Sequence, residues 1–198
     1  MANLKEIRGR IKSIKSIQKV TSAMKMVAAA KLRTSQSNME QCRPYSGKIT
    51  SLLNDLMADC NSNDYALMNK RDVNKTLYVV ITSDRGMAGA FNTNILKKAQ
   101  SDIDLDSKEN SIIIPIGKKS RDYFKNRNFN IFSEHIEFWG DLNFNHAIKI
   151  GDEIVNLFLS QKVDKVKIYY NEFKNLATQV IKNVDFLPLE NIDTETKT

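Results

Sequence analysis

Apolar residues recur along the first 57 positions at spacings of three and four, which predicts one long amphipathic helix. The apolar positions that open this seam are Leu4, Ile7, Ile11, Ile14, Ile17, Val20, Met24 and Val27. The step from Ile14 to Ile17 is three residues where four was due, a stammer that overwinds a supercoil. The repeat resumes after Ala28 and runs to Leu56, with an interruption expected near Pro44 and Gly47.

A helix of about 55 residues is about 80 Å long, because each residue adds about 1.5 Å. The residues that follow are too few to bury a stripe of that length. We therefore expect a second helix to cover the seam, as in a coiled coil. The segment Met24–Ala30 is rich in small and flexible side chains. The first interpretation is close helix packing, and the second is a surface on which flexible Met side chains slide past changing partners.

From about residue 75 the pattern changes to strands that alternate with helices. The expected strands are Thr76–Thr82, Ser111–Ile116, Val166–Tyr170 and Thr178–Val184, the helices Asn92–Ile103, Lys118–Asn126 and Asn145–Gln161, and one extended stretch Asn130–Phe138. Such alternation predicts βαβ units. The fold class is therefore α/β: a long N-terminal coiled-coil helix and a Rossmann-like domain with a mostly parallel sheet. The divisions are a helix over 1–58, a linker over 59–74, the α/β domain over 75–189 and a polar tail over 190–198.

The positive charge of the chain is concentrated in the predicted long helix. The net charge is +7. Residues 1–50 hold eleven Lys or Arg against Glu6 and Glu40, a net of +9, and the rest of the chain has a net of −2. A basic helix of this kind indicates an acidic partner, which leaves nucleic acid, anionic lipid and an acidic protein surface open.

The composition excludes several classes of protein. The 198 residues are 41% apolar and 27% charged, which is ordinary for a globular chain. The longest apolar runs, Met26–Ala30 and Leu77–Ile81, are far too short to span a bilayer. The two cysteines, Cys42 and Cys60, lie far from either histidine in the sequence, so neither a disulfide framework nor a zinc site is expected.

Three short motifs resemble ligand-binding sequences without completing them. Gly117-Lys118-Lys119-Ser120 lacks the first glycine of a phosphate-binding loop. The carboxylates from Asp102 to Asp106 lack the glycine and glutamate of a calcium loop. Gly86 and Gly89 lack the dinucleotide spacing, and we expect them to allow a close approach of strand and helix. His135 and His146 have no nucleophile nearby in sequence, so no catalytic, cofactor or metal residue is predicted.

Two sequence blocks closely resemble the gamma subunit of F-type ATP synthases. The first is Ile7-Arg-Gly-Arg-Ile-Lys-Ser-Ile14 followed by Gln18–Arg33, with Arg43-Pro-Tyr45 further on. The second is Thr82–Asn92, in which Met87-Ala88 stands where many members carry Leu-Cys. The turn at Gly117–Lys119 also fits, and the resemblance extends to about Leu189. Family members are longer and end in a second long helix, so the chain resembles a gamma subunit without that C-terminal helix.

The resemblance implies a non-catalytic rotor subunit. In the family, two paired helices form a shaft inside a ring of alpha and beta subunits, and the α/β domain contacts the epsilon subunit and the membrane c-ring. Proton flow turns the shaft, and chemistry takes place on beta. The implied location is the cytoplasmic face of the bacterial plasma membrane, as a peripheral protein without a cofactor.

The resemblance also implies roles for individual residues. The residues expected to pack on the second helix are Ile7, Ile11, Ile14, Ile17, Val20, Met24 and Val27. Met24, Lys25, Lys31 and Arg33 are candidates for contacts with acidic loops of beta, the alternative being a solvated basic face. Without its partner helix, we expect the seam to self-associate or to fold back on the domain.

A nucleic-acid-binding protein that uses the basic helix is the alternative function. It is weakened because residues 1–44 contain no aromatic side chain for base stacking. A nucleotide-binding enzyme is a third possibility that depends on the α/β domain alone.

Overall fold

The computed structural model describes residues 3–58, 65–175 and 178–190, so the first part of the expected linker and most of the expected tail lie outside the described residues. The chain forms two compact units, the long helix and the α/β domain.

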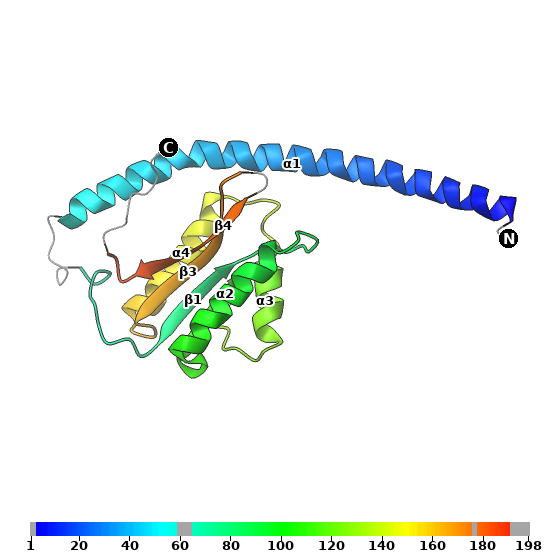
Figure 1. Ribbon diagram of the computed structural model, residues 1–198. Helices are drawn as coiled ribbons and strands as arrows, with labels where there is room; N and C mark the ends of the chain where they lie inside the picture. The colour runs from blue at the N-terminus through cyan, green and yellow to red at the C-terminus, as the bar shows by residue number, and fades with distance from the viewer. Residues whose placement is uncertain (1–2, 59–64, 176–177, 191–198) are drawn as a thin grey trace. The chain divides into compact units, whose positions relative to one another are not determined.

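The first unit is a single helix, α1, over Leu4–Ala58. It is 55 residues long, and none of its residues is buried. The interruption expected near Pro44 and Gly47 was wrong, because α1 runs through both residues (Figure 1). Proline removes its own backbone N–H bond and its ring crowds the carbonyl four residues earlier, at a cost of about 3 kcal/mol, and a helix of this length can continue on both sides of it.

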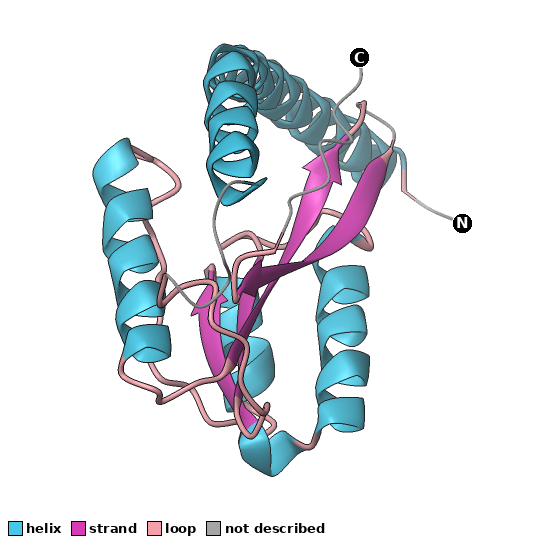
Figure 2. Ribbon diagram, turned by 90° about the vertical axis from the view of Figure 1, so that its left-hand side faces the viewer, coloured by secondary structure: helices cyan, strands magenta, loops and turns pink. Residues whose placement is uncertain are grey.

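The second unit is a four-stranded sheet with helices on both faces (Figure 2). Its elements are β1 (Thr76–Ile81), α2 (Phe91–Asp106), a 3-10 turn η1 (Lys108–Asn110), β2 (Ser111–Ile116), α3 (Lys118–Lys125), α4 (Phe144–Leu159), β3 (Lys165–Phe173) and β4 (Gln179–Leu187). The strand order is β2-β1-β3-β4. β1 is parallel to β2 and β3, and β4 is antiparallel to β3. The predicted α/β class with a mostly parallel sheet is confirmed.

Two apolar layers hold the sheet between its helices. On one face, Leu77 and Val79 of β1 pack with Leu157 and Phe158 of α4. On the other face, Tyr78 and Val80 pack with α2 and α3. This is why β1 reads as a continuous apolar run: successive side chains point to opposite faces, and both faces are covered.

The extended stretch expected at Asn130–Phe138 pairs with the edge of the sheet at two points. Ile131 bridges Ile113 of β2, and His135 bridges Ile116, both in parallel. Because the two bridges are isolated, the stretch extends the sheet without forming a regular strand. It brings the chain from α3 past the carboxyl end of β2 to the start of α4.

Candidate functional site

The apolar seam of α1 is exposed along its length. Its seven predicted packing residues, Ile7 to Val27, have exposed fractions between 44% and 65%. With about 100° between successive residues, the group from Ile17 to Val27 is turned about a third of a turn from the group Ile7, Ile11 and Ile14. A companion helix must therefore wrap around α1 to follow the seam past the step at Ile14.

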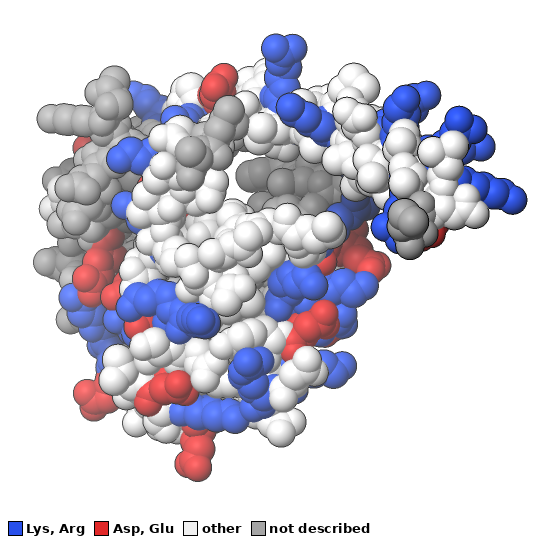
Figure 3. Space-filling view, turned by 45° about the vertical axis from the view of Figure 1, so that its right-hand side comes forward, with Lys and Arg blue, Asp and Glu red and all other residues white. Residues whose placement is uncertain are grey.

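The candidate contact residues Met24, Lys25, Lys31 and Arg33 are all exposed on α1, and they do not share one face. Met24 and Lys31 are about 20° apart around the axis, while Lys25 and Arg33 are about 80° apart on a different side. In the view of Figure 3, Lys and Arg dominate along α1, whereas both charge signs are interspersed on the α/β domain. The structure thus distributes positive charge around the helix instead of concentrating it on one stripe.

The carboxyl edge of the sheet, where α/β proteins often bind ligands, is filled by backbone contacts. Gly117 follows β2 with φ +97°, and a Cβ at this position would lie 2.2 Å from the Thr82 carbonyl oxygen. The Thr82 hydroxyl accepts a hydrogen bond from the Ser120 amide at 2.8 Å. The glycine therefore serves to join the ends of β1 and β2 closely.

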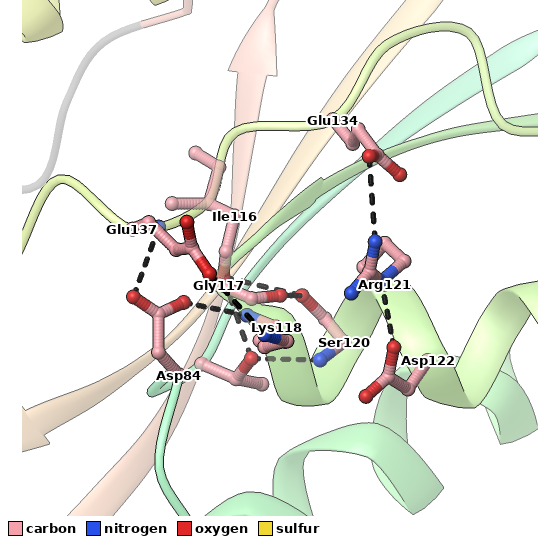
Figure 4. Close-up of polar contacts among 10 residues, drawn as sticks. Asp84, Ile116, Gly117, Lys118, Ser120, Arg121, Asp122, Glu134 and Glu137 are labelled. Carbon is pink, nitrogen blue, oxygen red and sulfur yellow. Dashed lines mark hydrogen bonds and ion pairs between the residues drawn. The ribbon is translucent and has the colours of Figure 1, made fainter.

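Asp84 ties three segments together at the same edge (Figure 4). One carboxylate oxygen accepts a hydrogen bond from the Lys118 amide at the start of α3, at 2.7 Å, and the other from the Glu137 amide at 3.0 Å. The Lys118 ammonium also lies 3.2 Å from the Glu137 carboxylate. A carboxylate at a helix N-terminus satisfies free amides and complements the helix dipole, so Asp84 takes the position where a bound anion would sit.

The explanation expected for Gly86 and Gly89 was wrong. A Cβ at Gly86 would touch only the end of the Lys119 side chain at 3.4 Å, and one at Gly89 would meet nothing within 4 Å. Gly89 instead has φ +56°, and its neighbour Met87 has φ +63°. These residues form an exposed turn between β1 and α2, and the close backbone approach is at Gly117.

The two histidines hold neighbouring segments together. His135 Nε2 lies 2.8 Å from the Glu153 carboxylate of α4. The His146 ring stacks on Phe138 with centroids 5.3 Å apart, and its Nδ1 accepts a hydrogen bond from the Asn143 amide at the N-terminus of α4. These contacts explain both residues as structural links.

The carboxylates of the calcium-like segment are used inside the domain. Asp102 accepts a hydrogen bond from the buried Tyr169 hydroxyl, and Asp106 accepts one from Tyr78. Burial, with the hydrogen bond to the neighbouring aspartate as the next cause, raises the pKa of both phenols. Burial opposes ionisation of Asp106, but hydrogen bonds from Lys167 and Tyr78 outweigh it and lower the pKa of that carboxyl. The two tyrosines are therefore neutral hydrogen-bond donors at neutral pH.

A clamp that the sequence did not reveal joins the segment before β1 to the turn before β3. The Arg71 guanidinium donates hydrogen bonds to the carbonyl oxygens of Phe158 and Val163 and forms an ion pair with Asp164 at 2.8 Å. Asp164 also accepts hydrogen bonds from the Asn74 and Lys75 amides. Arg71 and Asp164 are about 90 positions apart in the sequence. Their pairing could not be identified from the sequence pattern.

Neither a metal site nor a membrane span is found in the part of the chain that the structure describes. Among residues 3–58, 65–175 and 178–190, no three His, Cys, Asp or Glu side chains gather as metal ligands would. No helix in these ranges combines the length and apolar character that crossing a bilayer requires.

The solved structures compared with this chain include rotor parts of ATP synthases. The chain is similar to a chain of the Tetrahymena thermophila mitochondrial ATP synthase central stalk and c-ring, with TM-score 0.67, 28% identity and coverage of 85% of this chain and 72% of that chain. A rotor chain of the Euglena gracilis enzyme, at TM-score 0.56 and 22% identity, has the same fold. The long helix and the α/β domain place the chain in the class of ATP synthase central-stalk proteins.

Sequence comparison identifies the family. The ATP synthase family profile matches residues 3–198. The ATP synthase gamma chain of Christiangramia forsetii is 45% identical, covering 98% of this chain and 68% of the relative, and that of Chloroherpeton thalassium is 43% identical, covering 96% and 64%. The chain belongs to the ATP synthase gamma chain family. It spans about two thirds of the length of these relatives, and the matches do not support the nucleic-acid-binding alternative.

Proposed function

We propose that this chain is a non-catalytic central-stalk subunit of an F-type ATP synthase. It transmits the rotation of the proton-driven c-ring to the catalytic sites on beta. Its partners are the alpha and beta subunits, the epsilon subunit and the c-ring, and its location is the cytoplasmic face of the bacterial plasma membrane. The observation that carries this function is α1: 55 residues, basic and without a buried side chain, in a chain of the gamma family.

The two parts of the chain have different roles in this proposal. Residues 1–58 form one half of the shaft, with the seam from Ile7 to Val27 against a companion helix. Residues 75–189 form the foot that meets epsilon and the c-ring, 59–74 link the two, and 190–198 are a polar tail. The closed edge at Asp84 and Gly117 supports a structural foot, because its amides are already satisfied by the chain itself.

The distribution of charge around α1 fits a shaft inside a ring. A helix that meets several copies of one acidic loop must offer cations on more than one side. Lys31, with the uncharged Met24 beside it, serves one side in this proposal, and Lys25 and Arg33 serve another. Exposed ion pairs contribute about 0–1 kcal/mol each, so these contacts orient the shaft more than they fix it.

The experiment is a titration of the 198-residue chain against a purified ring of alpha and beta subunits. We expect saturable binding that weakens as salt is raised, because the contacts are between exposed charges. Lys25→Glu, Lys31→Glu and Arg33→Glu should each weaken binding several-fold. Lys12→Glu, the same charge change on α1, is the matched control and should have a smaller effect.

Two results would contradict the proposal. Equal effects of Lys12→Glu and the three test variants would show a general basic face without defined contacts. Tight binding to duplex DNA at physiological salt, without binding to the ring, would favour the nucleic-acid function that the sequence left open.

A further inference from the structure

The first part of α1 carries an apolar stripe that points to one side of the helix. Its members are Leu4, Ile7, Ile11 and Ile14, with exposed fractions between 44% and 65%. With about 100° between successive residues, these four side chains fall within a sector of about 80°. Ile17 points about 100° away from the centre of this sector, so the stripe ends after Ile14.

A basic stripe runs beside the apolar stripe. Over the whole of α1 the cations point to several sides, but those before position 20 are ordered differently. The members of the basic stripe are Lys5, Arg8, Lys12, Lys15 and Lys19, all exposed. Their spacing of three and four residues keeps them within a sector of about 80°, centred about 100° from the apolar stripe.

No carboxylate of this segment neutralises the basic stripe. Glu6 is the one acidic residue between positions 3 and 19. It lies on the other side of α1, where the Arg10 guanidinium pairs with its carboxylate at 2.8 Å. The face opposite the apolar stripe is small and uncharged, with Gly9, Ser13 and Ser16. Residues 4–19 therefore have separate apolar, basic and small polar faces.

The angle between the two stripes distinguishes a flat partner from a rod. A companion helix on the apolar stripe reaches the flanking Arg8 and Lys15. The other three cations, Lys5, Lys12 and Lys19, lie further around α1 and beyond the reach of that helix. A bilayer surface meets both stripes at once: when the apolar stripe enters the acyl-chain boundary, cations at the side of the helix lie at the level of the headgroups.

We propose that residues 4–19 of α1 bind an anionic phospholipid membrane, with the helix axis in the plane of the interface. The basic stripe selects anionic headgroups, and the apolar stripe inserts between the lipids. The segment is about 24 Å long, because each residue adds about 1.5 Å. A companion helix would compete for the apolar stripe, so this binding belongs to a chain whose seam is uncovered. It is independent of the rotary function.

The experiment is co-sedimentation of the full 198-residue chain with large unilamellar vesicles. One set contains phosphatidylcholine with about one third phosphatidylglycerol, and the other contains phosphatidylcholine alone. We expect binding to the anionic vesicles to be at least about tenfold tighter and to weaken as salt is raised, because the cations are exposed.

Two matched pairs of variants locate the surface on α1. Lys12→Glu should weaken binding to the anionic vesicles several-fold, while Lys48→Glu, the same charge change at an exposed position outside residues 4–19, should have a much smaller effect. Ile11→Ser should also weaken binding several-fold, with Ile49→Ser as its control. Circular dichroism verifies that each variant keeps the helix. Loss of vesicle binding by Lys12→Glu with binding to the alpha and beta ring retained would separate this surface from the proposed ring contacts.

The proposal is overturned if the chain binds both kinds of vesicle equally, or if Lys48→Glu weakens binding as much as Lys12→Glu. It is also overturned if Ile11→Ser binds like the native chain, because the contact would then be adsorption by charge without insertion. Equally tight binding to soluble polyglutamate would overturn it as well, since an acidic protein would then satisfy the same stripe.

Discussion

The Arg71–Asp164 clamp gives the sharpest test of how the α/β domain is held together. Asp164→Asn keeps the shape of the side chain and removes its charge. The side chains of Arg71 and Asp164 are only 23% and 12% exposed, and the guanidinium lies 4.4 Å above the Phe158 ring. After the substitution the cation stays in place, held by two carbonyl oxygens but without its anion.

The size of the effect follows from this partial burial. Removing one partner of a fully buried ion pair costs about 3–5 kcal/mol. Arg71 keeps some access to water, and the Asn74 and Lys75 amides donate to the same Asp164 oxygen, so an asparagine oxygen in that place can still accept both backbone hydrogen bonds. We therefore expect Asp164→Asn to lower the free energy of unfolding by about 2–3 kcal/mol.

The assay is urea unfolding followed by Trp139 fluorescence, which reports on the α/β domain without a contribution from α1. Asp72→Asn is the matched control: it removes the same charge from an exposed residue next to Arg71 and should change stability by less than about 0.5 kcal/mol. A loss below about 1 kcal/mol for Asp164→Asn, or an equal loss in the control, would refute the clamp as an energetic link.

The same carboxyl predicts a pH dependence. Burial opposes ionisation of Asp164, but the hydrogen bonds from the Lys75 and Asn74 amides and the Arg71 cation outweigh it and lower the pKa of the carboxyl. Because the folded pKa is below the unfolded one, the stabilisation is complete above the unfolded pKa, near 4, and is lost as pH falls through the folded pKa. Asp164→Asn should therefore lose less stability than the native chain when the pH is lowered from about 5 to 3.

Three further predictions address the backbone and the long helix. Gly117→Ala should destabilise the domain by more than about 3 kcal/mol in urea unfolding, because its Cβ would overlap Thr82. Gly89→Ala has only an unfavourable φ and should cost about 1 kcal/mol, and equal losses would contradict the close approach. Pro44→Ala should let α1 retain more of its helical circular dichroism signal on heating, because it restores a backbone hydrogen bond. An unchanged melting curve would argue against this. The 198-residue chain should show concentration-dependent self-association in sedimentation equilibrium, which a monomer at all concentrations would disprove.

The sequence was sufficient for the elements whose pattern is local. The spacing of Ile7, Ile11 and Ile14 indicated α1, and the β-branched run at Thr76 indicated β1, because periodicity directly reflects which faces are buried. Pro44 was misleading, since one missing hydrogen bond is a small part of a helix this long. The antiparallel direction of β4 was not predicted, because strand orientation depends on the short connection after β3.

The site was less accessible to sequence reasoning. Asp84 and Lys118 meet across 34 positions, and neither has a pattern that identifies its partner. Phe144 and Ile148 of α4 are apolar but exposed, so the apolar periodicity of this helix does not by itself identify which of its residues are buried. The family resemblance supplied candidate contacts such as Lys25, whose expected partner is on another chain.

The contrast between the two units sets very different rates of amide hydrogen exchange. β1 is bonded on both edges and covered on both faces, so its amides should exchange only through opening of the whole domain. α1 has no buried side chain to hold its turns closed. Its amides should exchange through local helix–coil fluctuations. Protection that appears along α1 would show that a companion helix or a surrounding ring of subunits has bound to it.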